Sequence, residues 1–127
     1  MEAHDVAALA ASLPTLDLSR MPTKEEAMAA APLLGSLGSS EVRLCRFAGQ
    51  PPWEKHPEDE LIHVLDGAVR VTLLEGAEPS TIDLRAGSLV VVPAGVWHRS
   101  LAPDGVTVIA VTPAEGNEAS FADDPRS

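Results

Sequence analysis

The sequence predicts an all-β domain that begins with a short helical arm. Its 127 residues suit one compact domain, and a 45% share of hydrophobic residues is enough to build a core. Eleven prolines and nine glycines interrupt the chain, most of them after residue 40. Between them lie short runs of apolar and β-branched residues, which is the pattern of a domain made of many short strands.

The first forty residues differ from the rest and are expected to form an arm of helical and extended segments over residues 1–40. Thr23 and Glu26 are spaced as a capping box, so a helix should begin at this point. A shorter helix is predicted upstream, where three apolar residues share helical spacing: Val6, Leu9 and Leu13. Residues 15–18 are compatible with an edge strand.

The main domain is expected over residues 41–112, with strands at 41–48, 60–65, 68–74, 81–84, 89–92, 97–101 and 106–112. Asp66-Gly67 lies between two of these runs, and this dipeptide tolerates the positive φ of a type I′ turn. Strands 60–65 and 68–74 are therefore predicted to form a hairpin. Residues 93–95 and 103–105, each with a proline and a glycine, mark two further turns. Residues 113–127 form an acidic tail that is predicted to be mobile or to lie on the surface.

Charge and composition exclude several classes of partner. The formal net charge is -10 and the pI is about 4.6, so the chain repels nucleic acid and anionic lipid. Cys45 is the single cysteine and cannot form an internal disulfide, which favours a reducing compartment. The first residues are acidic, and no apolar run reaches the length of a membrane span. We expect a cytoplasmic protein without a membrane partner.

Side chains capable of binding metal are concentrated in two segments of regular spacing. The first segment reads Gly49, then Glu54-x-His56-x-x-x-Glu60, then six residues and Gly67. The second segment reads Gly87, five residues, Pro93-x-Gly95, two residues and His98. No glycine-rich phosphate loop, nucleophile elbow or cysteine pair accompanies them.

These two segments resemble the two motifs of the cupin superfamily, in the same order and with a similar intermotif length. The resemblance implies a double-stranded β-helix, the jelly-roll barrel of RmlC-like proteins, with metal ligands that point into the barrel. It also implies a homodimer paired through an outer sheet, with the arm crossing to the partner or covering the barrel mouth. Two positions depart from the motifs, because Glu54 replaces the first histidine and Ala102 replaces the closing asparagine.

The spacing also has a direct physical reading. Side chains two apart on a strand share a face, so Glu54 and His56 can both project into the barrel. A turn at 57–59 can return Glu60 to the same centre, and His98 arrives from another strand. His56, Glu60 and His98 form a set of two histidines and one carboxylate, which suits Fe(II), Mn(II), Ni(II) or Zn(II). Glu54 is a candidate fourth ligand, or it pairs with an arginine on the neighbouring strand.

Two other side chains are given no part in the site. His63 lies three residues after Glu60 on a strand and should point to the opposite face. Cys45 has no nearby histidine or basic helix end, so a buried and inert thiol is expected.

Three functions remain open from the sequence. The first is a metal-dependent enzyme, an oxygenase (a dioxygenase, for example) or an isomerase, that acts on a small organic molecule. In that case Glu54 either binds the metal or serves as a base. The second is a non-catalytic cupin that binds or senses a small ligand, and the third is a barrel with a decayed metal site. The expected barrel lining is largely apolar and offers few groups to orient a polar substrate.

Overall fold

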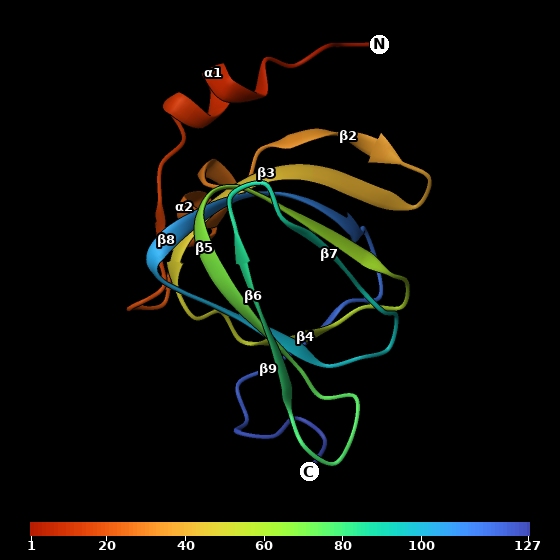
Figure 1. Cartoon of the computed structure of the whole chain (residues 1–127). Coiled ribbons are helices and arrows are strands. Elements are labelled where there is room, and N and C mark those ends of the chain that lie inside the picture. The colour runs from red at the N-terminus through yellow and green to blue at the C-terminus, as the bar shows by residue number, and fades with distance from the viewer.

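The computed structural model describes residues 1–127 as two curved β-sheets that face each other, with two short helices near one end (Figure 1). The first sheet has the order β7 (Leu89–Val92), β5 (Glu60–Leu73), β8 (His98–Pro113) and β3 (Ser40–Gly49), with β1 (Leu16–Asp17) and β2 (Leu33–Leu37) on the other edge of β3. The second sheet has the order β6 (Ser80–Arg85), β5, β8, β4 (Trp53–Lys55) and β9 (Glu118–Ser120). The predicted all-β class is confirmed.

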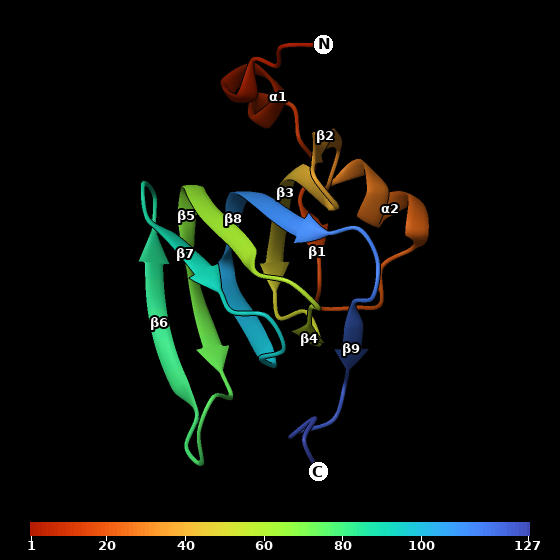
Figure 2. The ribbon, with the colours of Figure 1, turned by 90° about the vertical axis from the view of Figure 1, so that its right-hand side faces the viewer.

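Strands β5 and β8 belong to both sheets and pair antiparallel with each other, as Figure 2 shows in the middle of the molecule. Each strand bends at a glycine with positive φ, 80° at Gly67 and 93° at Gly105. The two bends lie against each other, so a Cβ atom on Gly67 would overlap with the carbonyl oxygen of Gly105. This close approach explains why glycine is required where the paired strands cross from one sheet to the other.

Two predicted turns are therefore wrong. No hairpin forms across Asp66-Gly67, because residues 60–63 pair with β7 while residues 68–73 pair with β6. Residues 103–105 likewise lie inside β8 and do not end a strand. Register shifts on both sides of the bend leave Pro103 outside the ladder, so its missing N–H costs no hydrogen bond. A dipeptide that suits a tight turn also suits a bend within a strand.

The arm forms the predicted helices, α1 (Val6–Ala11) and α2 (Lys24–Ala29), and β1 is the expected edge strand. At the start of α2 the Thr23 hydroxyl accepts a hydrogen bond from the Glu26 N–H, and the Glu26 carboxylate accepts one from the Thr23 N–H, so the capping box is confirmed. Hydrogen bonds from Arg20 and Thr23 lower the pKa of Glu26 to about 2. Strands β2 and β9 were not predicted, and β4 was expected only as the strand that carries Glu54 and His56. Neither helix has the length or apolar character needed to span a membrane.

The core fills the space between the two sheets around the bends in β5 and β8. It consists of nine buried side chains, Ile62, Val64, Val69, Val71, Leu84, Val92, Ala102, Val106 and Val108. On the outside of β3, Arg46 fastens the arm through hydrogen bonds to the carbonyl oxygens of Ala10 and Leu13 and to the hydroxyl of Thr107. The arm is thus attached beside the opening of the barrel.

The glycine bend yields a stability prediction. Gly67→Ala should lower the free energy of unfolding by about 2 kcal/mol or more, because the added Cβ meets backbone and the left-handed conformation is disfavoured. Gly76→Ala is the matched control, since a Cβ atom at that position contacts nothing within 4 Å. Urea unfolding of both variants measures the difference. Equal midpoints for the two variants would contradict the assigned role of Gly67.

Candidate metal centre

A cavity of about 380 Å³ opens between the sheets beside the core, and all four sequence-predicted ligands line it. Glu54 lies on β4 and His56 directly after that strand, while Glu60 and His98 are the first residues of β5 and β8. His56, Glu60 and His98 are buried, and Glu54 is half-buried. Backbone pairing of Glu54 with His98 joins the two motif segments at this point.

Glu60 lies at the centre of the group. Its Oε1 atom is 3.2 Å from Nε2 of His98 and 3.4 Å from Nε2 of His56. Its Oε2 atom accepts a hydrogen bond of 2.6 Å from the Thr112 hydroxyl on β8. The two imidazole rings are 5.0 Å apart, so both rings and the carboxylate surround one small volume.

The outer nitrogen of each imidazole is held by an acceptor. Nδ1 of His98 is 3.1 Å from the Val96 carbonyl oxygen, which can only accept, so this nitrogen carries the proton. Nδ1 of His56 is 2.7 Å from Oδ1 of Asn117. The Asn117 amide is oriented by its own N–H group, which donates to the Pro113 carbonyl at 2.7 Å. Both histidines consequently direct an unprotonated Nε2 at the same carboxylate oxygen when they are neutral.

Three acceptors facing one another explain the electrostatics of the site. Burial disfavours the charge on Glu60, but the protonated forms of His56 and His98 and the hydroxyl of Thr112 stabilise it and lower its pKa to about 2. Burial also disfavours the charge on His56, but the Glu60 carboxylate and Asn117 outweigh it and raise the pKa of His56. Burial and the charge of Glu60 raise the pKa of Glu54. The group therefore favours a positive charge at its centre, supplied by a proton or by a metal ion.

The donor set fits a divalent metal. Glu54, His56 and His98 each offer one ligand atom, and these atoms all lie within 4.8 Å of one another. Nε2 of His56 is buried and has no hydrogen-bond partner, as expected for a nitrogen that is a metal ligand. Arg43 and Arg46 bond elsewhere, so the alternative of a Glu54–arginine pair is not found. Glu60 is not one of these three residues, although its Oε1 atom lies 3.4 Å from Nε2 of His56 and 3.2 Å from Nε2 of His98.

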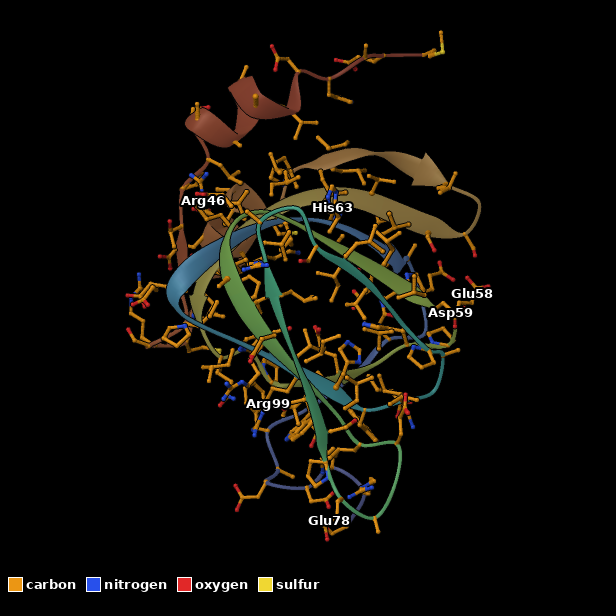
Figure 3. All side chains as sticks on the ribbon, in the orientation of Figure 1. Arg46, Glu58, Asp59, His63, Glu78 and Arg99 are labelled. Atoms are coloured by element: carbon orange, nitrogen blue, oxygen red, sulfur yellow. The ribbon has the colours of Figure 1, made fainter.

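The remaining side chains follow the alternation of the strands. His63 is half-buried on the opposite face of β5 from Glu60, and Figure 3 places it on the outer side of the sheet. Cys45 is half-buried, not fully buried, and lines the cavity, where burial raises the pKa of its thiol to about 11. That shift favours the unreactive protonated form, as expected for an inert thiol.

Asn117 is the site residue that the sequence did not reveal. It lies in the acidic tail, outside both motif segments, and precedes β9, which pairs with β4. Nothing in the local pattern distinguishes it from a surface asparagine. Its role arises only because β9 returns this part of the chain to His56.

Comparisons with known proteins agree with this arrangement. A family model described as a cupin domain matches residues 44–112. An uncharacterized protein of Bacillus subtilis, YdbB, is 37% identical over 60 residues, which are 46% of this chain and 50% of YdbB. The matched segment thus spans only half the length of that relative.

Solved structures share the fold. Protein NMB1881 of Neisseria meningitidis superposes with a TM-score of 0.65 at 17% identity, over 89% of this chain and all of that one. Hydroquinone 1,2-dioxygenase PnpCD, in complex with Cd²⁺ and 4-hydroxybenzonitrile, superposes with a TM-score of 0.57 at 25% identity, over 68% of this chain and 64% of that one.

The hydrogen bonds at the two imidazoles predict their tautomers. Nitrogen-15 NMR of the metal-free protein, at a pH above the histidine titration, should show the proton on Nδ1 in both His56 and His98. Asn117→Ala should shift the tautomer of His56 and leave that of His98 unchanged, which makes His98 the internal control. A proton found on Nε2 of His56 in the unaltered protein would refute the assignment.

Proposed function

The chain belongs to the cupin family, and on that basis we propose that it is a metal-binding cupin whose barrel takes up a small organic molecule beside the metal. Glu54, His56, Glu60 and His98 would hold the ion, which would be Fe(II), Mn(II), Ni(II) or Zn(II). One observation carries the proposal: two buried imidazole nitrogens, Nε2 of His56 and Nε2 of His98, face one buried carboxylate oxygen of Glu60. A divalent cation at this point resolves the conflict between three acceptors.

An oxygenase or isomerase is the reaction class that this site supports best. When bound, a divalent ion supplies Lewis acidity and, if it is redox-active, a binding position for oxygen. Thr112 and Asn117 keep Glu60 and His56 in position. The raised pKa of Glu54 suits a group that exchanges a proton with a substrate, so this residue is either the fourth ligand or the base.

The second candidate function is non-catalytic binding of a small ligand in the same cavity. The cavity walls favour it, because most side chains outside the metal centre are apolar and offer little to direct a reaction. A barrel with a decayed metal site is the third possibility. Metal binding separates the decayed site from the other two, and turnover of a bound molecule separates catalysis from binding.

Metal should stabilise the fold, because ligands from two separated segments come together only in the folded chain. At a free metal concentration of about a hundred times the Kd, the gain is roughly 2.7 kcal/mol, or several degrees in Tm. His98→Ala should lose most of this gain, and His63→Ala, on the outer face, should keep it. Thermal melts with chelator and with each of the four metals test this, and failure of every metal to move the wild-type transition would favour the decayed site.

The same melts should depend on pH in opposite ways with and without metal. The pKa of His56 is raised on folding, so without metal its contribution to stability is present in acid and is lost as pH rises through that pKa. Glu60, with its pKa near 2, stays charged throughout. With metal, the gain should instead shrink as pH falls, because the proton on His56 competes with the ion. If the increase in Tm caused by metal did not change between pH 5 and 8, His56 would be excluded as a ligand.

We also propose that the chain forms a homodimer through the outer face of the first sheet. Two rows of adjacent outward residues cross β7, β5 and β8, namely Val91, Leu61 and Val111, then Leu89, His63 and Ile109. Leu89 and Val91 are 57% and 49% exposed. None of the six is an acid, although the net charge of the chain is -10. A second copy related by a twofold axis presents the same apolar rows, so the two faces are complementary.

Val91→Glu should convert this dimer to monomer, because it places two like charges in the apolar face. Ile82→Glu on β6 is the control, since Ile82 is 40% exposed but lies outside that face. Sedimentation velocity of the three proteins measures the mass. A monomeric wild type, or a Val91→Glu variant that remains dimeric, would disprove this interface.

A further inference from the structure

We infer that the cavity, as the substrate site of the metal centre proposed above, selects uncharged molecules with an apolar body and excludes organic anions. This inference rests on the proposed function for the metal and concerns the chain's own residues around it.

The walls beyond the metal centre are mainly aliphatic. Ile62, Val108 and Ala110 come from the paired strands β5 and β8, and Phe47 comes from β3. Leu16 and Leu18 of the arm complete the wall near the opening. Such a surface gains free energy by burying a hydrophobic body and offers no compensation for a buried charge. The volume of about 380 Å³ lies at the small end of the usual range for ligand sites.

The two arginines that line the cavity already have partners within the chain. Arg43 donates to the Ala31 carbonyl at 2.7 Å and forms an ion pair of 3.3 Å with Glu41, which also lines the cavity. Arg46 is held by three acceptors of the arm and β8. At the metal centre, the two carboxylates of Glu54 and Glu60 balance a divalent ion. Both guanidinium groups are thus held by acceptors of the chain, and the carboxylate of a ligand would have to displace those acceptors.

One neutral polar group on the wall makes no hydrogen bond within the chain. Ser100 lies two residues after His98, so its hydroxyl is on the same face of β8. A hydroxyl can donate or accept, and it therefore suits an uncharged amide, alcohol or carbonyl on the ligand. This group adds orientation without adding charge.

Two probes of nearly equal shape test the charge selection. 4-Hydroxybenzamide is neutral, and 4-hydroxybenzoate carries a carboxylate at neutral pH. Titration calorimetry on protein whose metal content has been measured should give an affinity at least about tenfold higher for the amide.

A charge variant provides the sharper test. Glu41→Gln removes the partner of Arg43 without changing the shape of residue 41, so the benzoate should gain roughly tenfold in affinity while the amide changes little. The double variant Glu41→Gln with Arg43→Gln should lose that gain. Glu75→Gln, at an exposed position, is the control for the smaller net charge alone.

The outcomes separate this inference from the proposed function. A preference for the amide, reversed or reduced by Glu41→Gln alone, supports it. Three results would overturn it: tighter binding of the benzoate by the unaltered protein, no increase in benzoate affinity in Glu41→Gln, or binding of neither probe by metal-loaded protein. None of these results contradicts the proposed metal centre. Absence of bound metal under every loading condition contradicts the proposed function instead. The amide preference can then still be measured on the metal-free cavity by titration calorimetry.

Discussion

The pairing of β5 with β8 is the constraint on which the rest of the structure depends. Both strands continue from one sheet into the other, and they can do so only by bending together where Gly67 meets Gly105. The bend closes the two sheets over a common interior. It also brings together the first residues of the two strands, Glu60 and His98, which are 38 residues apart in the sequence. Oε1 of Glu60 lies 3.2 Å from Nε2 of His98. The candidate metal centre is thus a consequence of strand topology.

A buried carboxylate is costly unless its environment compensates it, and here the compensation comes from several elements at once. Thr112 holds one oxygen of Glu60, and the two histidines share the other. The orientation of those histidines is in turn fixed by Val96 and Asn117. Stability and binding are therefore linked in this site, because the groups that would bind a cation are the same groups that need one.

The sequence predicted the parts of the site that depend on local spacing. Side chains alternate between the two faces of a strand, and this alternation predicted which side chains meet in the site, namely Glu54, His56, Glu60 and His98. The same alternation predicted that His63 lies on the other face of β5. The sequence failed where the outcome depends on contacts between distant segments. Asp66-Gly67 satisfies a hairpin turn and a strand bend equally well, and only the neighbours β6 and β7 decide between them. Asn117 and β9 were missed because a three-residue strand in an acidic tail carries no periodic signal.

The position of Asn117 has a consequence for biosynthesis. The segment from Glu54 to His98 leaves the ribosome before residue 117 does, so the two imidazoles can come together while His56 still lacks its hydrogen bond to Asn117. Domains fold progressively during synthesis. The final orientation of His56 must then await the docking of β9 onto β4. A metal ion would be bound by the complete site only after β9 has docked. A nascent chain would therefore hold the ion less firmly than the finished protein.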